Sequence, residues 1–305
     1  KRKFLKDQLQ AMEKVTSGTG LYEVPHSGME NAEFNKTELR YAGKNPNNYV
    51  LFNNELWRII GLVNTLEGQK VKIRKATALS EKKVYHAGVS GVNGAEGINQ
   101  WGPSTYEDGT AFNGADLQLY LNGEYFQSLT VEAQNMISDT TWNTGAGIYG
   151  THNLTNDLYV VERGNLNGKG CTTGTYCNDT VVRTTSWDGH IALFYPSDYG
   201  YATSGGSTTR RNTCLNTSLQ VWNNANVSDC KNNDWLLGGT GWQWTLTPAI
   251  SPNKSSFSFD FEGSGYMDWT RAKYADIVFP TAYMKNNLKI VSGTGTSSNP
   301  FILNF

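Results

Sequence analysis

Residues 49–60 hold the clearest pattern of apolar and polar positions in the chain. Two apolar runs, Tyr49–Phe52 and Leu56–Ile60, flank Asn53-Asn54. Asn tolerates the left-handed backbone of a tight turn, so the segment predicts a β-hairpin. Lys70–Arg74 then alternates polar and apolar side chains, which is typical of a strand with one solvent-exposed face. Together the three runs predict a three-stranded meander.

Three segments have apolar residues at helical spacing. In residues 1–14 the apolar positions are Phe4, Leu5, Leu9 and Met12. They predict a short amphipathic helix that docks on the domain or serves as a linker. Ala115–Leu121, ended by Asn122-Gly123, and Thr130–Ser138 predict two further short helices. In the last of these Thr130 is expected to cap the helix, and the expected buried stripe is Leu129, Ala133, Met136 and Ile137.

The C-terminal quarter returns to the alternation of strands. The segments are Trp242–Leu246, Phe257–Glu262 and Ile277–Pro280, with Gly263-Ser264-Gly265 as a hairpin tip. The side chains expected to face the core are Phe257, Phe259 and Phe261, and those expected to face solvent are Ser258, Asp260 and Glu262. Residues 143–240 are irregular and rich in Gly, Asn and Thr, and loops of this length are usually functional. Strands at both ends with helices between them predict an α+β domain whose first and last strands share a sheet.

The composition is that of a folded chain with a very polar surface. Of the 305 residues 38% are hydrophobic, and the mean hydropathy is -0.49. Lys+Arg 26 against Asp+Glu 27 gives a net charge of -1, which argues against nucleic acid or anionic lipid as the main partner. No run approaches the ~18 apolar residues of a membrane span, so membrane attachment is expected only through a segment absent from this chain. Lys1-Arg2-Lys3 is compatible with the flank of a removed signal or anchor segment, or with an arbitrary start.

The four cysteines fall as two local pairs in loop-like sequence. Cys171 and Cys177 form one pair, and Cys214 and Cys230 form the other. A cross-link that closes a loop of about 15 residues is worth roughly 3 kcal/mol. We therefore expect two local disulfides in an exported protein. Four reduced thiols are the alternative, and a zinc site fits poorly because the spacing of the first pair is unlike that of zinc knuckles.

Several motifs in order give the chain a family resemblance. They are NNELWRIIG, LQLYLNGEYFQSLTVEAQNMI, LFYPSDYGYAT, NDWL and IVFPTAYMKNNLKIVSGTGTSSNPF, within residues 40–305. In this order they resemble the DUF6273 family of exported bacterial domains, which is related to the C-type-lectin-like and formylglycine-generating-enzyme folds. Similar proteins occur on the surface of gut Firmicutes, some of them behind a pilin-like or other anchoring helix. The family brings no established activity.

The resemblance implies a fold and a set of core residues. It predicts a helix or linker over residues 1–20 and a single C-type-lectin-like domain over residues 21–305. That domain would have antiparallel sheets, two short helices and long irregular loops. The resemblance assigns Trp57 and Ile59 to the core of the first sheet, and Phe279 and Tyr283 to the closing strand. The residues assigned to helix packing are Leu117, Leu121 and Phe126.

Signals for catalysis are weak. GAGIYG at residues 145–150 has the spelling of a dinucleotide loop, but no apolar strand precedes it and no evident helix follows, so no nucleotide is expected. The four histidines are scattered, and an Asp-Gly turn explains Asp188 beside His190 equally well. No cysteine follows Cys230, so the active-site cysteine pair of formylglycine-generating enzymes is absent. We predict that the chain is not an enzyme and needs no cofactor.

Binding is the remaining class of function. The C-terminal hairpin offers rigid aromatic and short polar side chains, a mixture typical of recognition surfaces. The predicted binding residues are Asp260, Glu262, Tyr266, Asp268, Trp269, Arg271 and Tyr274. They predict an extracellular, surface-displayed adhesion module that binds a glycan, a peptide, or a host or neighbouring protein. The alternative is a structural subunit of a pilus-like filament or surface layer, which binds its own copies.

Calcium-dependent sugar binding is a narrower form of this hypothesis. Asn233 and Asp234, which follow Asn232 and precede Trp235, offer the oxygen ligands that calcium prefers. Their order differs from the usual Trp-Asn-Asp pattern of lectins. They are therefore weak candidates for a metal site.

Overall fold

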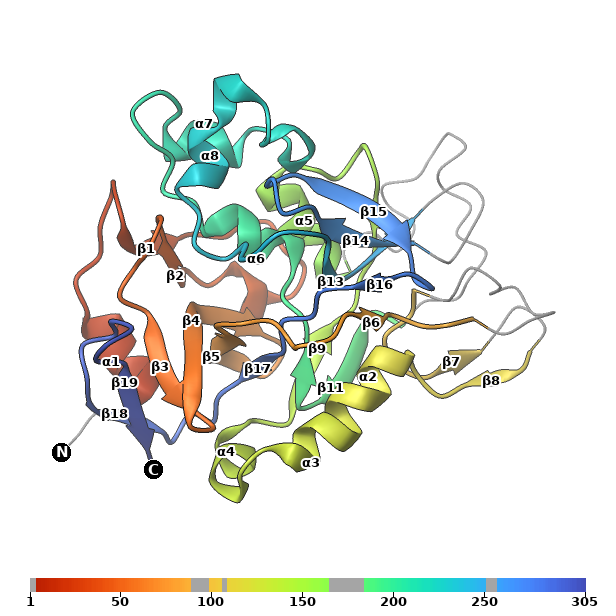
Figure 1. Ribbon diagram of the computed structural model, residues 1–305. Helices are drawn as coiled ribbons and strands as arrows, with labels where there is room; N and C mark the ends of the chain where they lie inside the picture. The colour runs from red at the N-terminus through yellow and green to blue at the C-terminus, as the bar shows by residue number, and fades with distance from the viewer. Residues whose placement is uncertain (1–3, 89–98, 106–108, 165–183, 251–256) are drawn as a thin grey trace.

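The computed structural model describes residues 4–88, 99–105, 109–164, 184–250 and 257–305. In these residues the chain forms an α+β fold with several mostly antiparallel sheets, as predicted (Figure 1). The strands of the largest sheet follow the order β12-β17-β5-β4-β3-β19-β18, and β2 and β1 branch from β4. Their bounds are β1 Gly20–Val24, β2 Glu38–Ala42, β3 Tyr49–Phe52, β4 Glu55–Thr65, β5 Gly68–Lys75, β12 Ile191–Ala192, β17 Thr281–Tyr283, β18 Lys289–Ser292 and β19 Phe301–Asn304.

The predicted meander is confirmed by β3, β4 and β5. Asn53 and Asn54 connect β3 to β4 with φ angles of 53° and 58°, the left-handed values that the turn requires. β19 lies parallel to β3, with Phe301 opposite Val50. The prediction that the first and last strands share a sheet is therefore also confirmed.

The prediction of a solvent-exposed face on β5 is wrong. Lys72 and Arg74 are 0% and 1% exposed. Helix α6, Pro196–Tyr201, covers this face and supplies Asp198 as the partner of Lys72, while Arg74 lies on the ring of Phe279. Charged side chains buried in this way need such partners, and alternation along a strand does not reveal them.

A second sheet has the order β10-β13-β14-β15, with bounds β10 Gly147–Ile148, β13 Gln243–Ile250, β14 Phe257–Phe261 and β15 Met267–Arg271. The predicted hairpin with its tip at residues 263–265 is confirmed, and Gly265 has a φ of 101°. The prediction of a strand over Ile277–Pro280 is wrong: β16, Ala275–Asp276, ends before it and β17 begins after it. Pro280 has no N–H to donate to a ladder, which explains why β17 starts at the next residue.

Three small ladders complete the sheets of the described residues. β9, Thr140–Asn143, pairs with β11, Ser186–Gly189. β6, Lys83–Val84, pairs with β16, and β7, Ser104–Thr105, pairs with β8, Ala111–Phe112.

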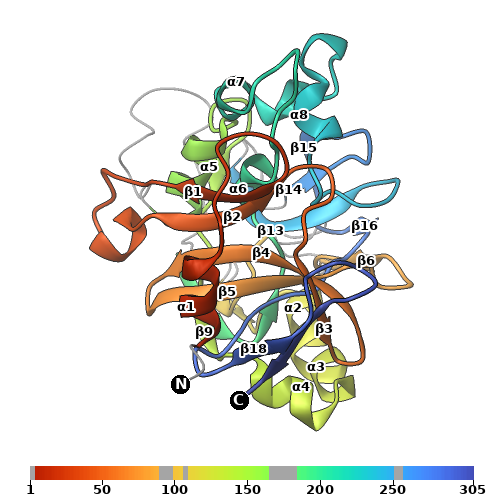
Figure 2. The same cartoon turned by 90° about the vertical axis from the view of Figure 1, so that its left-hand side faces the viewer.

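The predicted helices are present with one correction. α1, Leu5–Ala11, buries Leu5 and Leu9 against the main sheet beside β18 (Figure 2). α2, Asp116–Tyr120, does not end at Asn122-Gly123 but continues through a π-helical turn, Leu121–Tyr125, into α3, Phe126–Ser128. The Asn122 side chain does not terminate the helix because it bonds Ile191 of β12, donating to its carbonyl at 2.8 Å and accepting from its N–H at 2.9 Å.

The helix over Thr130–Ser138 is confirmed as α4, Val131–Met136. Thr130 caps it by accepting from the Ala133 N–H at 3.1 Å. The predicted stripe of Leu129, Ala133, Met136 and Ile137 is buried.

The prediction of two short helices is too low even for the described residues. Residues 143–240 contain α5 Thr155–Glu162, α6 Pro196–Tyr201, α7 Arg211–Leu215 and α8 Asp229–Asn232. Short 3-10 turns are present at Ala32–Asn35, Leu219–Val221 and Ala225–Val227. Arg211–Leu215 and Asp229–Asn232, for example, are mostly polar and show no apolar stripe at helical spacing, so the sequence did not predict them.

The hydrophobic core joins the two sheets through α6, which contacts β2 of the first and β13 of the second (Figure 1). The core residues expected from the family resemblance are buried: Trp57, Ile59, Leu117, Leu121, Phe279 and Tyr283. Phe126 is half-buried and stacks on His190, with ring centroids 4.5 Å apart.

Candidate functional site

The predicted binding residues of the hairpin fall into different environments. Asp260 is 0% exposed, so the prediction that it faces solvent is wrong. β14 lies between β13 and β15, and both of its faces are covered: Phe259 and Phe261 are buried on one, and Ser258 and Asp260 on the other. Alternation in a central strand therefore sorts side chains between two covered faces rather than between core and water.

Asp260 meets a second carboxyl group in this buried position. Its side chain lies close to the carboxyl group of Asp276 on β16. Burial, together with the charge of Asp276, raises the pKa of Asp260 well above its ordinary value. Burial also raises the pKa of Asp276, to about 6. Ionisation of both neighbouring carboxyl groups costs free energy because the two negative charges repel. The pair therefore keeps one proton at weakly acidic pH.

Three other predicted residues lie along the edge strand β15. Trp269 is opposite Phe259 in the ladder and shares its face of the sheet, whereas Asp268 is opposite Asp260 and lies with Tyr266 on the other face. Tyr266 meets Trp242 edge to face, with ring centroids 5.7 Å apart. Trp269 stacks on Tyr149 at 4.8 Å, and the Tyr149 hydroxyl hydrogen-bonds the carboxylate of Asp268. We call these half-buried residues the edge cluster: Tyr149, Trp242, Tyr266, Asp268 and Trp269.

Two members of the edge cluster were missed in the sequence. Trp242 is the first residue of the alternating segment Trp242–Leu246 and directly precedes β13. Tyr149 belongs to GAGIYG, which was considered only as a nucleotide loop. In the structure Gly147 and Ile148 of that loop form β10, parallel to β13. The loop thus brings Tyr149 across to Trp269 on β15.

The remaining predicted residues flank the edge cluster. Glu262 holds the hairpin tip, because its Oε2 accepts from the Ser264 N–H at 2.6 Å. Arg271 donates from Nη1 to the hydroxyl of Tyr274 at 3.3 Å, and Tyr274 is 47% exposed. These three residues contact the solvent near the cluster but none of its ring pairs includes them.

The weak calcium candidates have structural partners. Asp234 accepts from the Leu236 N–H through Oδ1 at 2.7 Å, and the Asn233 amide donates to the Asp229 carbonyl at 3.0 Å. Burial raises the pKa of Asp234 well above its ordinary value. Among the residues that the structure describes, no group of three or more His, Cys, Asp or Glu side chains is placed to hold a metal ion.

The predicted disulfide between Cys214 and Cys230 is confirmed. Cys214 of α7 and Cys230 of α8 are bonded to each other. Cys171 and Cys177 lie outside the described residues. The confirmed bond joins the short helices α7 and α8.

The sequence candidates for catalysis contact different partners. Asp188 accepts from the Thr141 hydroxyl at 2.6 Å, while the ring of His190 stacks on Phe126. His152 accepts from the Ile148 N–H through Nδ1 at 2.9 Å. Each group therefore has a local structural contact of its own.

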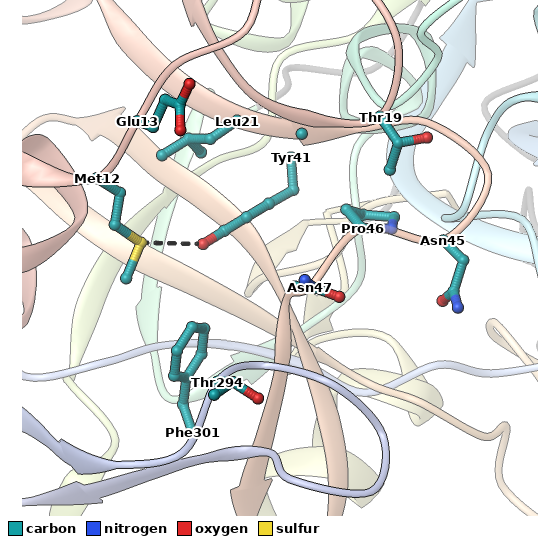
Figure 3. Close-up of a pocket in the computed structure, with 11 residues that line it drawn as sticks. Met12, Glu13, Thr19, Leu21, Tyr41, Asn45, Pro46, Asn47, Thr294 and Phe301 are labelled. Carbon is teal, nitrogen blue, oxygen red and sulfur yellow. Dashed lines mark hydrogen bonds between the residues drawn. The ribbon is translucent and has the colours of Figure 1, made fainter.

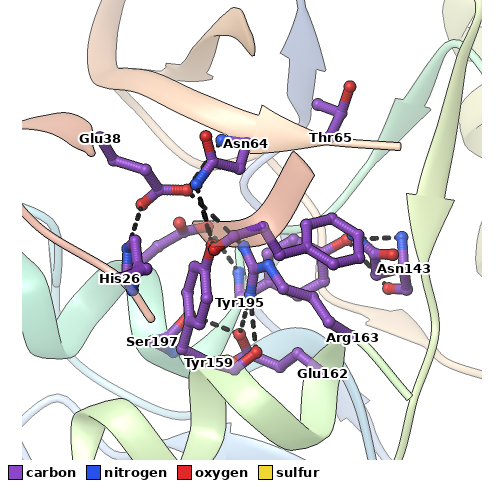
Figure 4. Close-up of polar contacts among 12 residues, drawn as sticks. His26, Glu38, Asn64, Thr65, Asn143, Tyr159, Glu162, Arg163, Tyr195 and Ser197 are labelled. Carbon is purple, nitrogen blue, oxygen red and sulfur yellow. Dashed lines mark hydrogen bonds and ion pairs between the residues drawn. The ribbon is translucent and has the colours of Figure 1, made fainter. Parts of the chain in front are cut away.

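A buried charge network includes Asp198 of α6 and was not predicted from the sequence. Figure 4 shows part of it, with Glu38, Glu162 and Arg163. Its members are Glu38, Arg40, Lys72, Glu162, Arg163 and Asp198, whose side chains are at most 1% exposed. Lys72 Nζ lies 2.6 Å from Asp198 Oδ2, and Arg40 bonds Asp198 Oδ1 and Glu38. Burial raises the pKa of Glu162 to about 7 and lowers that of Lys72 to about 8.

A surface pocket of about 340 Å³ lies between the end of α1, the start of β1 and the loop before β19 (Figure 3). Tyr41, Leu21 and Phe301 form its buried floor, and Tyr41 donates to the sulfur of Met12 at 3.3 Å. Its rim is polar and exposed, with Glu13, Thr19, Asn45, Asn47 and Thr294.

Comparisons with protein-family models, with curated proteins and with solved structures found no match for this chain. The resemblance to DUF6273 domains therefore stays a prediction. None of the helices in the described parts of the chain is long and apolar enough to cross a membrane.

Proposed function

We propose that this protein is an extracellular recognition module that binds a neutral glycan along the edge cluster. The observation that carries the proposal is the arrangement of four half-buried aromatic rings in two pairs, one on each face of the sheet at β15, with the Asp268 carboxylate beside the Tyr149 hydroxyl. Rings packed against each other are rigid, so a ligand that stacks on them loses little additional side-chain freedom.

A neutral polyhydroxyl ligand suits the chemistry of the cluster. The apolar faces of sugar rings stack on aromatic side chains, and a carboxylate accepts hydrogen bonds from their hydroxyl groups. Asp260 lies directly across from Asp268 in the ladder, and Asp276 contacts Asp260. This acidic background disfavours phosphate, sulfate and carboxylate groups.

Two features support a position at the cell surface and a binding role. The Cys214–Cys230 disulfide is typical of exported proteins. The different partners of Asp188 and His190 and the resemblance to DUF6273 domains both favour binding over catalysis, without a cofactor. We take the resemblance, including a lectin-like fold, as part of the proposal.

The alternative role as a filament subunit has less support. It relied on the amphipathic N-terminal helix as an assembly surface. In the fold, Leu5 and Leu9 of α1 are buried within the same chain, while Phe4 is 47% exposed. Most of the apolar stripe of α1 therefore packs on the protein's own core and is not exposed for assembly.

A panel of immobilised oligosaccharides tests the proposal. It should contain neutral hexose and N-acetylhexosamine chains alongside sialylated and sulfated ones. The proposal expects retention on at least one neutral chain and weaker retention on its anionic counterparts. Preference for the anionic members, or retention on none, would contradict it. Sedimentation of the same sample reports self-association, which the filament alternative requires.

A further inference from the structure

We propose that Lys72 and Asp198 become joined by an intramolecular amide bond that cross-links β5 to α6. The two side chains are 0% exposed, and Lys72 Nζ lies 2.6 Å from Asp198 Oδ2. They are 126 positions apart in sequence, so the fold alone brings them together. An amine held against a carboxyl group in a site that excludes water has the proximity that such condensation needs.

Aromatic rings enclose the lysine amine. Lys72 Nζ is 3.9 Å from the ring centroid of Tyr195, 5.3 Å from that of Trp142 and 5.4 Å from that of Tyr283. Burial lowers the pKa of Lys72 to about 8, even with Asp198 beside it. The neutral amine, which is the nucleophile, therefore forms at a lower pH than in an exposed lysine.

The carboxyl group is held in a fixed orientation. Arg40 donates to Oδ1, and the Tyr195 N–H donates to Oδ2 at 2.8 Å. Burial would raise the pKa of Asp198, but Lys72 and Arg40 together keep it below its ordinary value. Transfer of a proton from Lys72 to Oδ2 within the contact must therefore precede attack, since a carboxylate is a poor electrophile.

The reaction balances without any other reactant. The Lys72 nitrogen attacks Cγ of Asp198, the new N–C bond forms, and the C–Oδ2 bond breaks. Two of the three ammonium protons leave with Oδ2 as water, and Oδ1 remains as the amide oxygen, still facing Arg40. Glu162 accepts from the N–H and hydroxyl of Ser197, the neighbour of Asp198. These two bonds hold the start of α6 in place beside the reacting pair.

The surrounding charges favour the product. Lys72, Arg40 and Arg163 are buried together with Asp198, Glu38 and Glu162. The amide removes one cation and one anion from this set, and leaves Arg40 paired with Glu38 and Arg163 with Glu162. Burying an ion pair costs desolvation free energy, which the attraction between the two charges repays only in part. Formation of the amide removes this cost for Lys72 and Asp198.

The intact mass of the reduced, denatured protein tests the proposal directly. We expect a mass lower than that of the fully reduced sequence by one water molecule, and a branched tryptic peptide that contains Lys72 and Asp198. Lys72→Arg should restore the sequence mass. Asp198→Asn should lose ammonia instead of water and give the same branched product. Lys70→Arg, at a buried lysine of the same strand that bonds Glu67, Ser138 and Thr140, should still lose water.

The wild-type mass alone decides the matter even if a variant fails to fold. A folded wild-type protein with the full sequence mass would overturn the proposal, and so would a loss of water that maps to another pair of residues.

Discussion

The side chain of Gln8 bonds both backbone groups of Ile290, as a neighbouring strand would. Its amide donates to the Ile290 carbonyl at 2.9 Å, and its carbonyl accepts from the Ile290 N–H at 2.7 Å. α1 thus covers β18, the last strand in the order of the main sheet. Uncovered edge strands are templates for pairing with other chains, so α1 protects the sheet as well as extending its core.

Gln8→Ala should therefore destabilise the protein. The variant removes both bonds to Ile290 and should lower the free energy of unfolding by about 1–3 kcal/mol. Denaturant unfolding measures the change. Gln10→Ala is the matched control, because Gln10 is exposed on the same helix. Equal losses in the two variants would show that the Gln8 contacts contribute nothing specific.

Two substitutions in the turn between β3 and β4 should have different effects on stability. Asn54 has a φ of 58°, which glycine adopts freely and β-branched residues do not. Asn54→Gly should leave stability nearly unchanged, whereas Asn54→Val should lower it by about 1–2 kcal/mol. Thermal unfolding compares them. If the valine variant is as stable as the glycine variant, the turn does not have this backbone.

The disulfide of the α7–α8 region should contribute measurably to stability. Replacement of both Cys214 and Cys230 by Ser leaves the protein without a bond that spans a sequence separation of 16. The free energy of unfolding should fall by about 3 kcal/mol. The double variant isolates this bond better than a reductant does, because it leaves Cys171 and Cys177 untouched. An unchanged denaturation midpoint would contradict the prediction.

Stability should fall as pH rises from about 4.5 to 7. Burial raises the pKa of Glu162 from 4.5 to about 7 and that of Asp276 from 3.8 to about 6. Between the unfolded and folded pKa values the folded state binds more protons, so raising the pH favours unfolding. For Glu162 the effect amounts to at most about 3 kcal/mol.

Thermal unfolding at pH 5 and at pH 7.5 tests this sign. The midpoint should be higher at pH 5, and Glu162→Gln should reduce the difference because its amide does not titrate. Glu38, whose pKa is held low by neighbouring cations, loses its contribution only below this window. A midpoint that rises between pH 5 and pH 7.5 would contradict the assignment.

Local features of the fold were predictable from the sequence. The Asn53-Asn54 turn, the Thr130 cap and the Cys214–Cys230 bond each depend on residues close together in the chain. The fate of polar residues on strands was not predictable, because it depends on distant partners. Lys72 was expected in water but is buried with Asp198, 126 positions away. The prediction that Asp260 faces solvent is wrong for the same reason, since Asp276 and two flanking strands enclose its side chain.

The candidate site was predictable only in part. Tyr266, Asp268 and Trp269 belong to one hairpin, and its alternation and glycine tip are visible in the sequence. Tyr149 and Trp242 come from other segments, and nothing in their local sequence indicates that they pack on β15. A surface assembled from three segments requires the fold to define it.

Ligand affinity of two tyrosine variants tests the proposed edge cluster most directly. Tyr266 belongs to the cluster, whereas Tyr274 lies outside its ring pairs and is more exposed. With the neutral oligosaccharide retained best in the panel, titration calorimetry should show affinity weakened about tenfold or more by Tyr266→Ala, and within about twofold of wild type for Tyr274→Ala. Equal affinities in the two variants, with both proteins folded, would contradict the assignment of ligand binding to the edge of β15.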